Sequence, residues 1–149
     1  MLNLLRKHWI TFCMVGIACF LGVQIWQLWQ STVMPDVPGI KWAKYKEVAA
    51  ICYLPDCGCG ITAEELVRAA EANHIKTVVL TEKDMPELKQ LKGDFPDTQI
   101  IDHVPPKLMH KLAVLNKTEV LLIKNGHIVR SANGEFDFDL FFHRNAYAK

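Results

Sequence analysis

The sequence lacks any excess of charge, with 17 basic and 16 acidic side chains and a formal net charge of +1. Neither a nucleic acid nor an acidic partner is therefore indicated. It also contains no internal repeat, no glycine-rich phosphate-binding loop and no recognisable Ser-His-Asp arrangement. Phosphate-binding and serine-hydrolase chemistry are therefore not indicated. The 149 residues suffice for one small domain and one further segment.

Charge is absent altogether between positions 9 and 29. A helix of about twenty residues spans the roughly 30 Å hydrocarbon core of a bilayer. Trp9 lies at one end of this run and Trp26 and Trp29 lie at the other, where interfacial aromatic side chains are expected. The sequence therefore predicts a transmembrane helix over residues 9–29, preceded by a short cytoplasmic segment of residues 1–8.

The orientation of this helix follows from the basic residues beside it. Arg6 and Lys7 precede the run, which favours a cytoplasmic N-terminus and a single-pass protein of the inner (cell) membrane, its C-terminal domain outside the cytoplasm. Three lysines between positions 41 and 46 partly offset this bias, so the reverse topology stays open. A cleaved secretory signal is a further alternative, but the apolar run is long and no A-x-A-like site follows it. We expect an uncleaved anchor in contact with the lipid bilayer.

The five cysteines fall into two groups. Cys13 and Cys19 lie within the apolar run and Cys52 within a predicted strand, so packing is the expected role of all three. Cys57 and Cys59 instead belong to a glycine-containing turn, Asp56 to Gly60, between a predicted strand and a predicted helix.

The turn lies just before a predicted helix, and this position favours reactive thiols at Cys57 and Cys59. The unpaired N–H groups at a helix N-terminus favour a thiolate, and two thiols one residue apart indicate redox or soft-metal chemistry. Outside the cytoplasm such a pair can be held oxidised. Cys57 and Cys59 are therefore the candidate catalytic residues.

The first half of the domain is predicted to form a βαβ unit. The apolar run 47–54 predicts a strand buried on both faces, and the β-branched run 76–82 predicts a second strand. Thr62 and Glu65 match a capping box, which begins a helix at Ala63, and Asn73 is its expected left-handed stop. A helix beginning nearer Cys59 is the alternative. The unit implies parallel strands and a right-handed crossover.

The remaining elements are predicted from turn and helix signals. A short helix is expected over 84–92, an extended piece over 99–102 and another helix over 105–115. Asn125-Gly126 between two apolar runs predicts a β-hairpin, and the aromatic segment 136–142 predicts a last helix packed on the sheet. Residues 30–43 contain two prolines and no apolar period, so they predict a linker.

This order of elements, with cysteines after the first strand, resembles the thioredoxin-like superfamily, specifically its membrane-tethered extracytoplasmic members. The resemblance rests on the segments Ile51 to Cys59 and Val120 to Gly126. It implies an α/β domain over residues 44–149, with a central mixed sheet and flanking helices. It also implies thiol–disulfide exchange with protein thiols or disulfides, in which Cys57 attacks and Cys59 resolves.

Three departures from the family pattern bear on that activity. The cysteines form C-x-C where the family's oxidoreductases carry C-x-x-C. The family's cis-proline position is occupied by Thr118 or a neighbour. The buried carboxylate that many members use as a proton relay is replaced by Ile51, which leaves Asp56 as the nearest acid.

Three hypotheses for the dithiol follow. The first is thiol–disulfide exchange, for which a small, strained ring favours an oxidising or isomerising direction. The second is a soft-metal carrier, for instance of Cu(I), with His103 and His110 as possible ligands beside Cys57 and Cys59. The third is a non-catalytic interaction module of an envelope assembly. No organic cofactor is expected under any of them.

Overall fold

The computed structural model describes residues 14–26, 32–55, 60–113, 117–133 and 137–142. The chain forms two compact units, Met1–Val33 and Met34–Lys149. In the first unit, residues 14–26 are helical and all of their side chains are exposed. Within the described ranges, no helix is both long enough and apolar enough to cross a membrane. The predicted span, residues 9–29, extends past the described helix at both ends.

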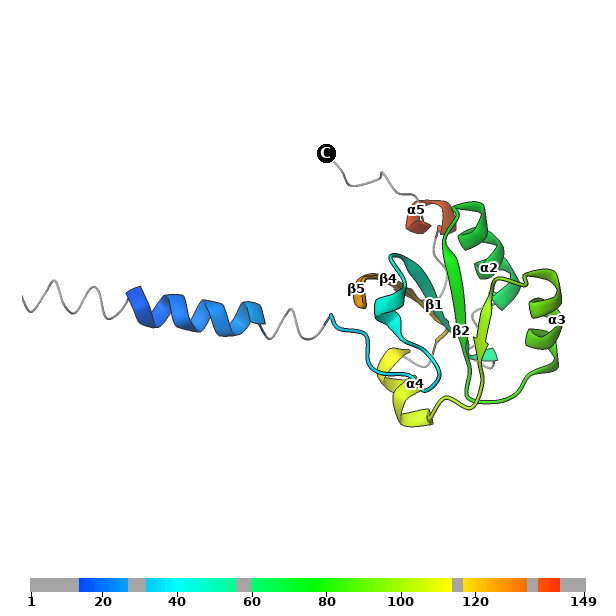
Figure 1. Ribbon diagram of the computed structural model, residues 1–149, viewed down its shortest axis with the longest axis horizontal. Coiled ribbons are helices and arrows are strands. Elements are labelled where there is room, and N and C mark those ends of the chain that lie inside the picture. Colours follow the sequence, from blue (N-terminus) through cyan, green and yellow to red (C-terminus); the bar gives the residue numbers. More distant parts are fainter. Residues whose placement is uncertain (1–13, 27–31, 56–59, 114–116, 134–136, 143–149) are drawn as a thin grey trace, which may run out of the picture. The chain divides into compact units, whose positions relative to one another are not determined.

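The second unit is built on a five-stranded mixed sheet with the strand order β3-β2-β1-β4-β5 (Figure 1). β1 pairs in parallel with β2 and antiparallel with β4, and β2 pairs in parallel with β3. The elements in chain order are η1 Trp42–Lys44, β1 Val48–Cys52, α2 Ala63–Ala72, β2 Lys76–Leu80, α3 Pro86–Asp94, β3 Gln99–Ile101, α4 Pro106–Leu112, β4 Glu119–Lys124, β5 His127–Asn133 and α5 Phe138–Phe142.

This architecture confirms the predicted α/β class with a central mixed sheet and flanking helices. β1 lies at the centre of the sheet, and all five of its residues are buried, as the unbroken apolar run predicts. The predicted βαβ unit is β1-α2-β2. The extended piece predicted over residues 99–102 is the edge strand β3, between helices α3 and α4.

Helix α2 begins where the capping-box sequence predicts. The Glu65 amide donates to Thr62 Oγ1 at 3.2 Å, and the Thr62 amide donates to Glu65 Oε2 at 2.9 Å. These reciprocal bonds fix the first helical residue at Ala63, so the alternative start nearer Cys59 is wrong. The C-terminal end needs a correction, because the left-handed residue is His74, with φ 57°, and not Asn73.

The hairpin prediction is confirmed in its strands and in its turn. Asn125 and Gly126 connect β4 to β5 with φ values of 51° and 83°. Both values lie in the left-handed region, which Gly and Asn adopt at the lowest steric cost.

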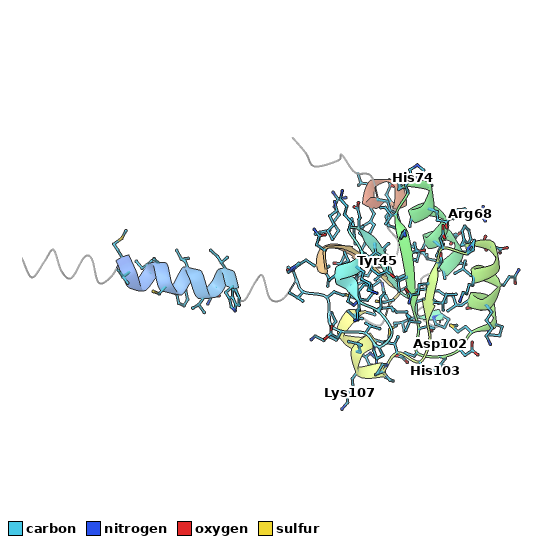
Figure 2. The ribbon with its side chains drawn as sticks, viewed as in Figure 1. Tyr45, Arg68, His74, Asp102, His103 and Lys107 are labelled. Atoms are coloured by element: carbon cyan, nitrogen blue, oxygen red, sulfur yellow. The ribbon has the colours of Figure 1, made fainter. Side chains whose placement is uncertain are left out.

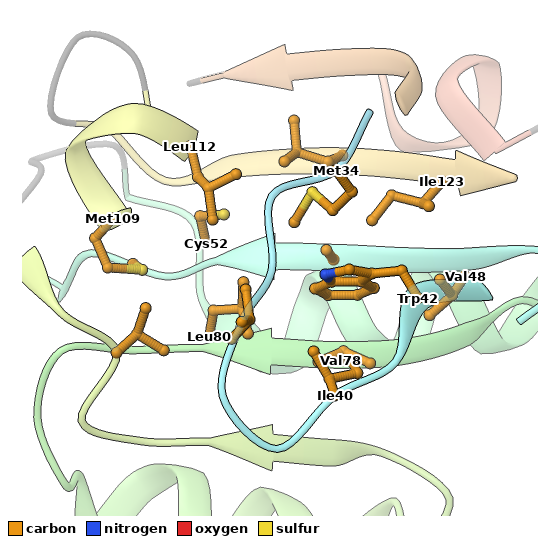
Figure 3. Packing of buried hydrophobic residues seen from close by; sticks show 14 of the residues in the cluster. Met34, Ile40, Trp42, Val48, Cys52, Val78, Leu80, Met109, Leu112 and Ile123 are labelled. Carbon is orange, nitrogen blue, oxygen red and sulfur yellow. The ribbon is translucent and has the colours of Figure 1, made fainter. Parts of the chain in front are cut away.

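Two hydrophobic clusters lie on opposite faces of the sheet. One contains side chains from α2, α3 and α5, and the other contains side chains from α4 and from residues 34–42. In the second cluster, Met34, Ile40 and Trp42 lie over β1, β2 and β4 (Figure 3). Figure 1 shows α4 on the side of the sheet opposite α2 and α3.

Residues 34–42, here called the strap, correct the predicted linker boundary. Val37 and Trp42 are only 3% and 5% exposed, and Trp42 Nε1 donates to the Pro35 carbonyl at 3.0 Å. The Met34 amide donates to the Gly126 carbonyl in the hairpin turn. The compact unit therefore starts at Met34, earlier than the predicted boundary at residue 44. The sequence hides this because apolar strap residues alternate irregularly with prolines and so follow neither a helical nor a strand period.

The C-terminal aromatic segment packs as predicted only in part. Phe141 and Phe142 of α5 are buried and meet edge to face, with ring centroids 5.0 Å apart. Leu140 is exposed, contrary to the prediction, because consecutive positions of so short a helix point in different directions. The Arg130 guanidinium holds α5 to β5 by donating to the Phe141 carbonyl at 2.9 Å.

Candidate functional site

One end of the sheet gathers several loops around the end of β1. The chain leaves β1 through residues 53–55 and re-enters described structure at residues 60–62, which lead into α2. After β2 and β3 on one side of β1, the chain crosses to β4 on the other side. Crevices outside strand ends at such a change of direction are common ligand sites in open α/β sheets. This end of the sheet is therefore the candidate site.

The predicted catalytic residues, Cys57 and Cys59, lie outside the described residues, as does Asp56. Pro55 precedes them and Gly60, with φ 67°, follows them. Because α2 begins at Ala63, Cys57 precedes the helix by more than one turn of sequence. The helix dipole, which fades within about a turn, therefore contributes less to a thiolate at Cys57 than a helix starting at Cys59 would.

Thr118 binds the backbone at the end of β1. Its side chain is buried, and Oγ1 accepts from the Leu54 amide at 3.2 Å and donates to the Leu54 carbonyl at 3.3 Å. A single hydroxyl thus takes up both polar groups of the residue that precedes Pro55. These two bonds, here called the Thr118 clip, join the start of β4 to the segment that leads into residues 56–59. Proline at position 118 would have neither bond, because it has no hydroxyl.

The residues just behind the clip include a buried thiol and a buried carboxyl group. Cys52 is fully buried at the end of β1, and it lies directly opposite Glu119 of β4, which is 5% exposed. Burial raises the pKa of the Cys52 thiol far above its ordinary value, and the charge of Glu119 raises it further. Cys52 is therefore a packing residue, as predicted, and is unsuited to be a nucleophile.

Beside the end of β1, the loop after β2 forms one wall of an open groove of about 400 Å³. Its lining comprises residues 53–55 and residues 81–87, and here it is called the β2-loop groove. Tyr53 and Glu87 also line a second hollow of about 250 Å³, between α2 and α3. The Tyr53 hydroxyl donates to Glu87 Oε1 at 3.5 Å, so this pair separates the two hollows.

The histidines named as possible metal ligands lie elsewhere on the domain. His103 is exposed, with φ 56°, in the loop between β3 and α4, where Figure 2 labels it beside Asp102. His110 is exposed on α4. Among the residues that the structure describes, no three His, Cys, Asp or Glu side chains are close enough to hold a metal ion. Cys57 and Cys59 fall outside that set.

Sequence reasoning identified the position of Thr118 but not the contact that its hydroxyl makes. It also missed Glu119, whose burial opposite Cys52 follows from the strand register, and the Tyr53–Glu87 pair, which joins residues 34 positions apart. One signal was available for Glu119. It directly precedes the apolar run 120–123, and such a run is typical of a strand buried on both faces.

No protein-family model and no curated protein matches this sequence. Among solved structures, the chain is similar to the solution structure of "a Putative Thioredoxin from Neisseria meningitidis". The two share 14% sequence identity with a TM-score of 0.53, over 79% of this chain and 95% of the other. At this identity the similarity shows the fold alone, and the fold is thioredoxin-like.

Proposed function

We propose that this chain is a membrane-anchored protein that carries out thiol–disulfide exchange through Cys57 and Cys59. The observation that carries the proposal is the position of the dithiol sequence in the fold. It connects the end of the central strand to helix α2, at the end of the sheet where the loops after β1 and β2 and the start of β4 come together. The thioredoxin-like fold supports a redox role for cysteines at this connection.

The chemistry needs only the two thiols and a substrate disulfide. The Cys57 thiolate attacks one substrate sulfur, forming a mixed disulfide and releasing the other substrate sulfur as a thiolate. The Cys59 thiolate then attacks Cys57 Sγ, which forms the Cys57–Cys59 disulfide and releases the second substrate thiol. The protein loses two electrons and the substrate gains two. The reverse sequence oxidises a substrate dithiol, and ring strain in a C-x-C disulfide favours that direction.

The Thr118 clip supports this assignment by fixing the backbone at one side of the dithiol segment. A nucleophile is efficient when its backbone is held in position before the substrate arrives. Leu54 is held on its N–H and on its carbonyl by a side chain that is 2% exposed. The backbone on the N-terminal side of the dithiol segment is therefore held by a tertiary contact at Leu54.

The test is a disulfide-exchange assay on the full-length chain with a model protein disulfide. We expect Cys57→Ser to abolish exchange and Cys59→Ser to trap the mixed disulfide. Cys52→Ala serves as the matched control, because that thiol is buried and should leave the exchange rate unchanged. Exchange at the parent rate in Cys57→Ser and Cys59→Ser would contradict the proposal.

The membrane anchor is the second part of the proposal. It is supported by the absence of charge over residues 9–29 and by the exposed apolar side chains of the helix at 14–26, such as Ile17, Phe20 and Ile25. We expect the full-length chain to remain in the membrane fraction after an alkaline carbonate wash, and a chain beginning at Thr32 to be soluble. Release of the full-length chain by the wash would contradict the anchor.

A further inference from the structure

Five apolar or aromatic residues line the β2-loop groove beside the proposed redox site. Leu54, Pro55, Met85 and Pro86 line it together with the ring of Tyr53. Its volume of about 400 Å³ is within the range of pockets that receive a small ligand or a few side chains. Leu54 and Pro55 directly precede the dithiol segment in the sequence, so a chain lying in this groove would contact residues next to that segment in the sequence.

Acidic side chains also line the groove. Glu82, Asp84 and Glu87 line it, and Lys83 is the one basic residue among its lining side chains. Asp84 is neutralised by Lys89, at 2.7 Å, whereas Glu82 and Glu87 form no ion pair with any residue that the structure describes. The groove thus combines an apolar lining with two carboxylates that are unpaired over the described ranges, Glu82 and Glu87, against one lysine, Lys83.

The neighbouring hollow, on the far side of the Tyr53–Glu87 pair, extends this charge. Glu64 and Asp94 line it, and no basic side chain does among the described residues. Arg68 compensates Glu64, but Asp94 has no ion-pair partner in the described part of the chain. Carboxylates without an ion pair among the described residues therefore line both hollows, Glu82 and Glu87 in the groove and Asp94 in its neighbour.

We propose that the β2-loop groove binds the polypeptide that flanks the reactive cysteine of a protein substrate, and that it selects segments with an apolar side chain beside lysine or arginine. The apolar side chain packs against the apolar lining of the groove and the basic side chain lies near Glu82 and Glu87. Opposite charges at such a surface act mainly through the association rate and through discrimination against like-charged partners. This inference rests on the proposed function and names its substrate class.

The experiment uses full-length Cys59→Ser protein, in which Cys57 forms a lasting mixed disulfide. Three synthetic peptides carry one cysteine each, activated as a disulfide with 2-nitro-5-thiobenzoate. One peptide flanks the cysteine with leucine and lysines, one with leucine and glutamates, and one with serine and lysines. The Cys57 thiolate attacks the peptide sulfur and the coloured thiolate leaves, so colour release gives the rate. The Cys57→Ser, Cys59→Ser double variant measures the background from the other cysteines.

We expect the leucine–lysine peptide to react on the order of tenfold faster than the leucine–glutamate peptide at low salt, with the difference falling as salt increases. The serine–lysine peptide should react more slowly than the leucine–lysine peptide, because it lacks the apolar side chain. Glu82→Gln and Glu87→Gln should each reduce the preference for lysine about threefold. The matched control is Glu71→Gln, which removes the same charge near the C-terminal end of α2, outside the lining of the groove. It should leave the preference for lysine unchanged.

The outcomes separate the inference from the proposed function. Reaction of all three peptides at equal rates, or an equal effect of Glu71→Gln and Glu82→Gln, would overturn the groove's role while leaving thiol exchange intact. No reaction above background with any peptide would refute the proposed function, and the inference would fall with it.

Discussion

Replacing Thr118 by valine tests whether the clip stabilises the candidate site. Valine keeps the branched shape of threonine but removes the hydroxyl, so both bonds to Leu54 are lost. A net contribution of about 0.5–1.5 kcal/mol per hydrogen bond gives about 2 kcal/mol for the pair. Leu54 is partly buried, so its N–H and carbonyl have restricted access to replacement water, which favours the upper part of that range.

The assay is urea unfolding of Thr118→Val and Thr118→Ser in parallel with the parent chain. Serine keeps the hydroxyl and loses one methyl group, which costs about 0.8 kcal/mol when buried. We therefore expect valine to lower the free energy of unfolding by about 2 kcal/mol and serine by less than half of that. A valine variant as stable as the serine variant would show that the hydroxyl contributes nothing and would refute the clip.

Two further predictions concern the core. The pKa of the Cys52 thiol is raised by burial above its ordinary value of 9.0, so the folded state disfavours its ionised form. This thiol's contribution to stability is fully present below pH 9.0 and is lost as the pH rises further, by about 1.4 kcal/mol per pH unit. Because the full slope develops only above pH 9.0, the loss between pH 8 and 10 is about 1.4 kcal/mol in total; urea unfolding should show this loss in the parent and not in Cys52→Ala, and equal losses would contradict it. The strap supplies four buried side chains, Met34, Val37, Ile40 and Trp42, each worth about 1.5–3 kcal/mol. A chain beginning at Ala43 should therefore lose cooperative thermal unfolding and a chain beginning at Thr32 should keep it, whereas cooperative unfolding of both would refute the strap's role.

The sheet was predictable because its strands carry strong local signals. β1 and residues 120–123 of β4 are uninterrupted apolar runs, the Asn125-Gly126 turn permits positive φ at both residues, and Thr62 with Glu65 is a complete capping box. In each case the residues that decide the structure are close neighbours in the sequence. The elements that these local signals predict are therefore the elements that the folded domain contains.

The strap was not predictable in the same way. Trp42 and Val37 are buried because α4 leaves part of one sheet face uncovered, which is a property of the assembled sheet. A segment that follows no regular period and contains Pro35 and Pro38 has the local features of a linker. Its burial depends on contacts with strands that lie far along the chain.

The candidate site was likewise predictable in its position along the chain but not in its contacts. Its place after the central strand follows from sequence order, whereas the contacts that define it are long-range. Thr118 and Leu54 are 64 positions apart, and the Tyr53–Glu87 pair joins the end of β1 to α3. No periodicity specifies such pairs, because they depend on how the loops meet at one end of the sheet.

The most direct test of the central claim is the redox equilibrium of the full-length chain against glutathione, with alkylation and mass spectrometry to identify each cysteine. We expect Cys57 and Cys59 to interconvert between dithiol and disulfide as one two-electron couple, with a potential above roughly −300 mV, while Cys52 stays a thiol throughout. A Cys57–Cys59 disulfide that glutathione cannot reduce, or two thiols that never pair, would contradict it.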